Sequence, residues 1–147
     1  IDTDFELLFP DDYINNITER LNLYTKLNGL KSEEELETFT NEIIDRFGEM
    51  PTQVVDLLNS VRIKWIAAKI GLEKIVMKQG RFIGYFINDQ NSSFYQSEDF
   101  SKVLQFIQTR PKDCKMKEKK TRNGLRLLLT FEHITSVDKA LSRLQEI

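Results

Sequence analysis

The sequence contains one cysteine and one histidine, and each scarcity excludes a class of site. Cys114 has no second cysteine with which to form an internal disulfide or a cysteine-based zinc cluster. His133 alone cannot build a histidine-rich metal site. The sequence therefore predicts no metal and no cofactor, and the single cysteine fits a cytoplasmic origin.

Motifs that bind nucleotides or carry a nucleophile are also missing. The sequence has no GxxxxGK(S/T) motif, no GxGxxG motif and no GxSxG motif. No apolar run approaches the roughly 20 residues that span a bilayer, and no signal peptide is present, so we expect no membrane contact. The chain begins with Ile1 instead of Met, and we expect it to be a piece of a larger protein.

One catalytic alternative rests on the single cysteine and the single histidine. If a predicted hairpin pairs residue 122 with residue 125, Cys114 lies near residue 133, and a Cys–His dyad is geometrically possible. We prefer a small, apolar-like thiol and a histidine at a strand end. The expectation is therefore that the chain has no catalytic residues and is not an enzyme by itself.

Charge is divided unequally along the chain. Residues 1–60 hold 14 acidic and 4 basic side chains, a net of −10, and residues 61–147 hold 9 acidic and 17 basic side chains, a net of +8. The two halves sum to the overall −2. Such a division suggests that different faces meet different partners.

Helical signals dominate the first half. After a short apolar segment at 5–9, which is a strand or an extended arm, helices are predicted over about 17–28, from Ser32 to Gly48, and from Pro51 to Gly71. The first has Asn16 as its N-cap, Gly29 as a left-handed stop, and an inner stripe of Ile17, Leu21, Tyr24 and Leu27. The second begins with a capping box and buries a stripe of Leu36, Phe39, Ile43 and Phe47.

The second half changes to strand periodicity. Short strands are predicted at 73–78, 81–87 and 93–96, with 81–87 central because it is apolar on both faces. A hairpin of 114–121 and 125–132 is predicted around Asn123-Gly124, and further helices from Ser97 and Thr135. The fold class is α+β: a three-helix segment at about 1–71, then a small mixed or antiparallel sheet of about five strands with two more helices at about 72–147, in one domain, 1–147.

An acidic patch is predicted on the second helix. Four acids lie on the side away from the buried stripe, and two of them, Glu42 and Asp45, are i,i+3 neighbours: Glu35, Glu42, Asp45 and Glu49. Arg46 lies beside them. The patch is either an ordinary solvated face or a docking surface for a basic partner.

A basic patch is predicted on the hairpin. Lys115, Lys117 and Lys119 alternate and share one face of a strand, and the patch is extended by Lys120, Arg122 and Arg126. These side chains could track a phosphate backbone. Lysines also protect an edge strand against unwanted pairing. We prefer the second interpretation because aromatic platforms are not interleaved with the lysines.

Several stretches, taken with their spacing, resemble one family. They resemble the C-terminal domain of the bacterial transcription-repair coupling factor, densely over about residues 5–76 and more thinly over 77–147. The stretches are Phe9-Pro10-Asp11-Asp12-Tyr13-Ile14, Arg20-Leu21-Asn22-Leu23-Tyr24, Glu33-Glu34-Glu35-Leu36, Glu42-Ile43-Ile44-Asp45-Arg46-Phe47-Gly48-Glu49-Met50-Pro51 and Ala67-Ala68-Lys69-Ile70-Gly71-Leu72-Glu73-Lys74-Ile75.

This resemblance implies a regulatory role. The parent is an ATP-dependent DNA translocase that pushes RNA polymerase off a lesion and recruits nucleotide-excision repair. Its C-terminal domain clamps the parent's N-terminal, repair-protein-like module, and so covers the surface that recruits the damage-recognition protein until polymerase is engaged. The docking acids match Glu42 and Asp45, with Arg46 and Glu49 as accessories. The alternative function is an accessory nucleic-acid module that holds the backbone through Lys115, Lys117, Lys119, Lys120 and Arg122.

Overall fold

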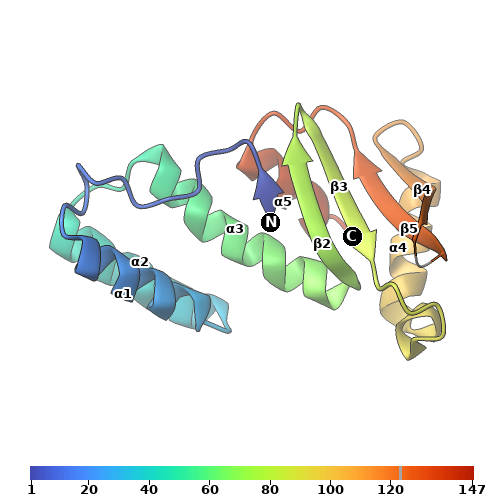
Figure 1. Ribbon diagram of the computed structural model, residues 1–147, viewed down its shortest axis with the longest axis horizontal. Coiled ribbons are helices and arrows are strands. Elements are labelled where there is room, and N and C mark those ends of the chain that lie inside the picture. The colour runs from blue at the N-terminus through green and yellow to red at the C-terminus, as the bar shows by residue number, and fades with distance from the viewer. Residues whose placement is uncertain (123) are drawn as a thin grey trace. The chain divides into compact units, whose positions relative to one another are not determined.

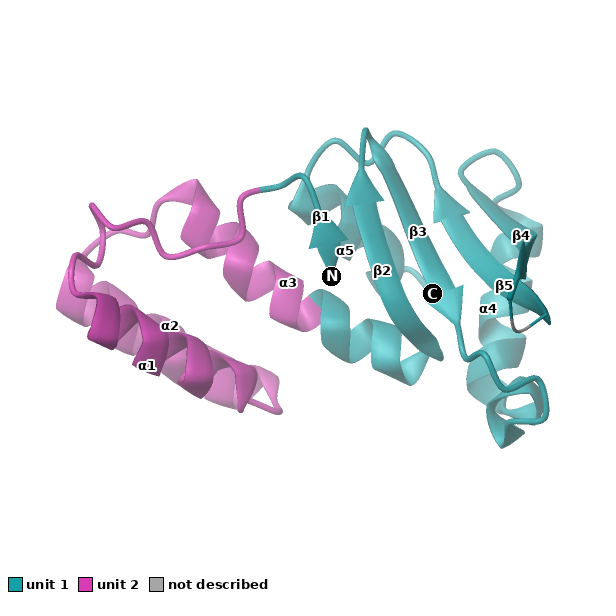
Figure 2. Ribbon diagram, in the orientation of Figure 1, with its two compact units in different colours: residues 1–5, 63–147 teal, residues 6–62 magenta. Residues whose placement is uncertain are grey.

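A computed structural model describes residues 1–122 and 124–147. The chain divides into two compact units: a helical unit of residues 6–62, and a sheet unit of residues 1–5 and 63–147 (Figure 2). The division falls inside helix α3 (Thr52–Lys69), so the first part of this helix belongs to the helical unit and its end to the sheet unit.

The helical unit consists of α1 (Ile17–Asn28), α2 (Glu33–Phe47) and the first part of α3. Both predicted N-caps are confirmed, because the side chains of Asn16 and Ser32 accept hydrogen bonds from the backbone amides of Glu19 and Glu35. The core of the unit comes from all three helices and from the segment before them: Phe9, Ile14, Leu23, Leu27, Leu36, Phe39, Ile43, Val54, Leu57, Leu58 and Val61. The predicted stripe of α2 is therefore confirmed at its first three positions.

The predicted inner stripe of α1 is wrong at two positions. Ile17 and Leu21 are 65% and 60% exposed, and the buried residues are Leu23 and Leu27. Leu27 fits either the predicted stripe or a stripe through Leu23, since both have helical spacing. Tertiary packing decides which of the two is buried. Gly29 is also not left-handed: its φ of −87° is right-handed, and its amide donates to the Thr25 and Lys26 carbonyls.

The segment after residue 5 is an extended arm and not a strand. Phe9 is buried with its ring centroid 4.8 Å from that of Tyr24, and its backbone amide donates to the Tyr24 hydroxyl over 2.8 Å. The Tyr13 hydroxyl donates to the Gly48 carbonyl over 2.7 Å. These contacts pin the arm against the helical unit, so its apolar residues serve packing instead of strand pairing.

The sheet unit contains a five-stranded mixed sheet (Figure 1). The strands are β1 (Asp2–Thr3), β2 (Leu72–Lys78), β3 (Arg81–Phe86), β4 (Cys114–Thr121) and β5 (Gly124–Phe131), in the spatial order β1-β2-β3-β5-β4. The β1–β2 pair is parallel, and the β2–β3, β3–β5 and β4–β5 pairs are antiparallel. Strand β3 is central, as its apolar residues predict. The hairpin pairs Thr121 with Gly124, whereas Asn123 of the predicted turn lies outside the described residues.

One face of the sheet carries the core of this unit. Helices α4 (Glu98–Thr109) and α5 (Val137–Gln145) cover this face behind the strands in Figure 1. The buried side chains between them include Phe82, Phe86, Val103, Leu129, Phe131, Val137, Leu141 and Leu144. Burying a large apolar side chain contributes about 1.5–3 kcal/mol, so this layer holds the sheet unit together. The opposite face carries no helix among the described residues of the sheet unit.

Residues 93–96 form a short 3₁₀ helix, so the strand predicted there is wrong. Ser92 and Ser97 bound this turn, and Phe94 packs against Phe100 at 5.5 Å and Phe86 at 6.5 Å between ring centroids. The two aromatic residues of this segment indicated a strand, but they join an aromatic cluster with α4 instead. The fifth strand of the sheet is β1, which the sequence did not identify.

Candidate docking face on helix α2

The candidate docking face is the side of α2 that points away from the core. Buried Leu36, Phe39 and Ile43 fix the orientation of the helix. With 100° of rotation per residue, side chains three and four positions apart line the opposite side. That side forms a shallow hollow of about 480 Å³, lined by Thr38, Asn41, Glu42, Ile44 and Asp45.

Two of the four predicted docking residues already have partners within the helical unit. Lys26 Nζ lies 2.7 Å from the Glu42 carboxylate, and Arg46 Nη2 lies 2.5 Å from that of Glu19. The Arg46 guanidinium also lies 4.8 Å from the Phe47 ring centroid. Both ion pairs join α1 to α2 and are substantially exposed, so each contributes only about 0.2–1 kcal/mol to stability.

The other two predicted residues are exposed and uncompensated. Among the residues that the structure describes, Asp45 and Glu49 make no ion pair. Glu49 lies beside a second shallow hollow of about 400 Å³, lined by Asp12, Tyr13, Glu49, Met50, Pro51 and Thr52. The available negative charge of this face is therefore centred on Asp45 and Glu49.

The same face has an apolar member, Ile44, that was not predicted from the sequence. Ile44 is 44% exposed and lies in the same hollow as Asp45. Its position, one residue after buried Ile43, places it off the core stripe, and this helical spacing could have revealed it. In protein interfaces, apolar side chains form the part that loses its water on binding, and charged side chains lie around it.

The structure separates the predicted basic patch into two parts. Lys115, Lys117 and Lys119 share one face of β4, which is an edge strand, as the preferred interpretation of these lysines expects. Lys120 pairs with Leu125 on the opposite face, because neighbouring strand residues point to opposite sides. Arg122 follows the end of β4 and is exposed.

The pairing that a Cys–His dyad would need, with Cys114 opposite His133, is not formed in the hairpin. Cys114 pairs with Phe131, whereas His133 lies beyond the end of β5 with φ of +60°. Burial, reinforced by the negative charge of Asp113, raises the pKa of the Cys114 thiol to about 12. A thiol with this pKa is protonated at neutral pH and is a poor nucleophile.

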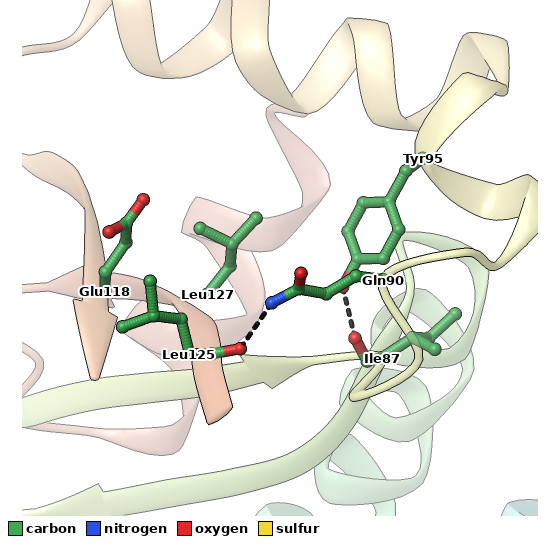
Figure 3. Close-up of a pocket in the computed structure, with 6 residues that line it drawn as sticks. All are labelled: Ile87, Gln90, Tyr95, Glu118, Leu125 and Leu127. Atoms are coloured by element: carbon green, nitrogen blue, oxygen red, sulfur yellow. Dashed lines mark hydrogen bonds between the residues drawn. The ribbon is translucent and has the colours of Figure 1, made fainter. Parts of the chain in front are cut away.

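A third pocket lies between the 88–96 segment and the β4–β5 hairpin (Figure 3). Its volume is about 300 Å³, and it is lined by Ile87, Gln90, Tyr95, Glu118, Leu125 and Leu127. Gln90 Nε2 donates to the Leu125 carbonyl over 2.7 Å, and the Tyr95 hydroxyl donates to the Ile87 carbonyl. The Gln90 bond therefore joins the hairpin to the preceding segment, and the Tyr95 bond closes that segment on itself.

The described residues, 1–122 and 124–147, contain neither a cluster of metal ligands nor a helix that could span a membrane. Within these ranges, no three histidine, cysteine, aspartate or glutamate side chains are placed to hold a metal ion together. Within the same ranges, no helix combines the length and the apolar character that crossing a membrane requires.

The fold of this chain is similar to that of a solved structure. A crystal structure of the C-terminal domain of transcription-repair coupling factor superposes with a TM-score of 0.67, at 17% sequence identity, over 99% of this chain and 92% of that one. The fold defines the class: the chain is an α+β domain, and it carries a charged face on α2 and a row of lysines on β4.

Sequence comparison then identifies the family. A family model for the TRCF domain matches residues 3–97. The chain is 29% identical over its whole length to the transcription-repair-coupling factor of Rickettsia bellii (strain RML369-C), and 40% identical over 68 residues to that of Escherichia coli (strain K12). It spans 12% of the first relative and the E. coli match spans 6% of the second. The chain belongs to the TRCF domain family, which confirms the resemblance of its motifs.

Proposed function

We propose that this chain is a non-catalytic docking domain that restrains a larger transcription-coupled repair protein. In this account the outer face of α2 binds a basic surface on the N-terminal, repair-protein-like module of the same parent. While it is docked, it keeps the damage-recognition protein from being recruited. Engagement of RNA polymerase releases it. Family membership supports this setting, since the curated relatives are transcription-repair-coupling factors.

The observation that carries the proposal is uncompensated charge beside an exposed apolar side chain. Asp45 has no ion-pair partner among the described residues, and it shares a hollow with half-exposed Ile44. Close charge pairs across a protein interface can couple by roughly 1.5–7 kcal/mol when they are desolvated, and by much less at a rim. Asp45 is therefore assigned the main electrostatic contact, and Ile44 the apolar contact beside it.

Glu42 and Arg46 have a different role in this proposal. Their ion pairs with Lys26 and Glu19 hold α1 against α2 and set the shape of the docking face. Glu42 also lines the hollow, so its carboxylate can be shared between Lys26 and a basic side chain of the partner. Glu49 extends the negative surface toward the second hollow.

Charge reversal in the full-length parent tests this function. Asp45→Lys is expected to loosen the clamp and to raise affinity for the damage-recognition protein, measured by pull-down or by fluorescence anisotropy. Glu118→Lys is a matched control, because it makes the same charge change at an exposed position of β4. Equal affinity of wild type and Asp45→Lys for the damage-recognition protein would remove the autoinhibitory role.

A further inference from the structure

The uncovered face of the sheet has an ordered arrangement of side chains. Strand register places one row across four strands: Lys74 on β2 opposite Tyr85 on β3, Tyr85 opposite Leu128 on β5, and Leu128 opposite Lys117 on β4. The next row contains Val76, Ile83, Thr130 and Lys115. On the other side of the first row, Lys119 lies opposite Arg126.

This face is strongly basic. Its cations are Lys74, Lys78, Arg81, Lys115, Lys117, Lys119 and Arg126. Three of them are paired with acids: Lys78 with Asp2, Arg81 with Glu132, and Arg126 with Glu73. Within the part of the chain that the structure describes, the other four make no ion pair, and all four are exposed. A surface with this surplus favours a polyanion.

An aromatic ring lies among these cations. Lys74 Nζ, the Arg126 guanidinium carbon and Lys119 Nζ lie 5.2, 5.4 and 5.8 Å from the centroid of the half-buried Tyr85 ring. This ring is not visible among the lysines in the sequence, because Tyr85 lies 30 residues before Lys115 in the chain. In the sheet, β3, which carries Tyr85, and β4, which carries Lys115, are separated by one strand, β5.

The three cations differ in how firmly they are held. Arg126 donates through Nε to the Phe86 carbonyl over 3.1 Å and through Nη2 to Glu73 over 3.5 Å, and its side chain is only 20% exposed. The ammonium groups of Lys74 and Lys119 both contact the ring, and Lys74 also interacts electrostatically with Asp2. These two flexible ammonium groups can move from the ring to a phosphate, while Arg126 stays beside the ring.

We propose that this open sheet face binds single-stranded nucleic acid. One base stacks on the Tyr85 ring, and Lys74, Lys117 and Lys119 neutralise the phosphates on either side of it. Sequence-tolerant single-strand sites combine a positively charged track with aromatic rings on which bases stack. A duplex would reach the lysines but hides its base faces, and an acidic peptide would use the charge without the ring. The Tyr85 ring therefore favours a single strand over both.

The test is a fluorescence-anisotropy titration of the 147-residue chain with a labelled oligothymidylate of roughly 12 nucleotides, a length within the range of sites in single-strand binders. With three phosphates neutralised, the slope of log affinity against log salt is about −2, so binding weakens roughly 20-fold between about 50 and about 200 mM salt. Lys117→Gln/Lys119→Gln is expected to make this slope shallower by about 1.4.

The ring has a separate signature. Tyr85→Ala is expected to weaken binding at least about fivefold with the salt slope unchanged, and Tyr85→Phe to keep wild-type affinity, because only the ring is needed for stacking. A circular-dichroism melt shows whether Tyr85→Ala is folded, and Tyr85→Phe and the lysine variants keep the test decisive if it is not. Lys102→Gln/Lys139→Gln, which removes two exposed cations from α4 and α5, is the matched charge control.

Three outcomes would overturn the proposal. The first is no detectable binding at about 50 mM salt, the low-salt condition at which phosphate contacts are strongest. The second is an equal loss of affinity in the Lys117/Lys119 and Lys102/Lys139 variants, which would show general attraction to a polyanion. The third is displacement of the oligonucleotide by polyglutamate of the same length at equal concentration, which would assign the face to an acidic protein surface.

Discussion

Lys26 Nζ and the Glu42 carboxylate lie 2.7 Å apart across α1 and α2, whereas Asp45, three residues further along α2, makes no ion pair among the described residues. The two acids that the family resemblance places together therefore differ in what they do inside this chain. Glu42 contributes to the packing of the helical unit, and Asp45 is available to a partner. Stability and binding measurements should separate them.

Charge reversal at these two positions should affect stability differently. Glu42→Lys removes the pair with Lys26 and sets two ammonium groups against each other, so we expect the free energy of unfolding to fall by about 0.5–1 kcal/mol. Asp45→Lys should change it by less than about 0.5 kcal/mol, as is usual for surface positions. Urea denaturation of both variants measures this difference, and equal losses would contradict it.

Gly71 and Gly80 have the same kind of backbone conformation but different surroundings, so alanine substitutions at the two positions can be compared. Both have positive φ, +81° and +75°, but a Cβ at Gly71 would lie 2.3 Å from Cε2 of Phe94, whereas a Cβ at Gly80 would meet nothing within 4 Å. Gly80→Ala should cost about 1–2 kcal/mol through the left-handed conformation alone. Gly71→Ala should cost more, because Phe94 must also move. Thermal melts of the two variants compare them, and equal costs would show that Phe94 yields freely.

The thiol of Cys114 should become sensitive to pH only in strongly basic solution. Burial raises its pKa from 9.0 to about 12, so in the unfolded chain it loses its proton at lower pH than in the folded chain. This group therefore contributes stability that is complete below about pH 9 and is lost as the pH rises toward about 12. The contribution should disappear in Cys114→Ala.

Alkylation offers a direct measurement of the same property. Near neutral pH, iodoacetamide should modify Cys114 no faster than the chain opens, because the thiol is buried and out of reach of the reagent in the folded chain. The reaction followed by mass spectrometry should therefore accelerate with added urea. Fast modification of the native chain would contradict the burial of this group.

Local signals determined how well the fold could be predicted from the sequence. The caps at Asn16 and Ser32 were correct because one side-chain oxygen and one nearby amide decide them. The central position of β3 followed from apolar residues on both of its faces. The 93–96 strand was wrong because the rings of Phe94 and Tyr95 pack in a cluster with Phe100, which sequence spacing does not reveal.

The candidate sites depended more on long-range contacts. The acidic face of α2 was accessible to sequence reasoning, since it needs only helical spacing and the family motif. Its division into a paired Glu42 and an unpaired Asp45 was not, because Lys26 lies on another helix. The position of Tyr85 among cations was also hidden, since it requires the four strands β2, β3, β5 and β4 to be placed in order.

The most direct test of the docking account is calorimetric titration of this chain against the isolated N-terminal module of its parent. We expect salt-sensitive binding that Asp45→Lys weakens by about tenfold or more, equivalent to about 1.4 kcal/mol, while Glu118→Lys binds as wild type does. Asp45→Lys binding as tightly as Glu118→Lys would contradict the account, because Asp45 would then contribute nothing to the interface.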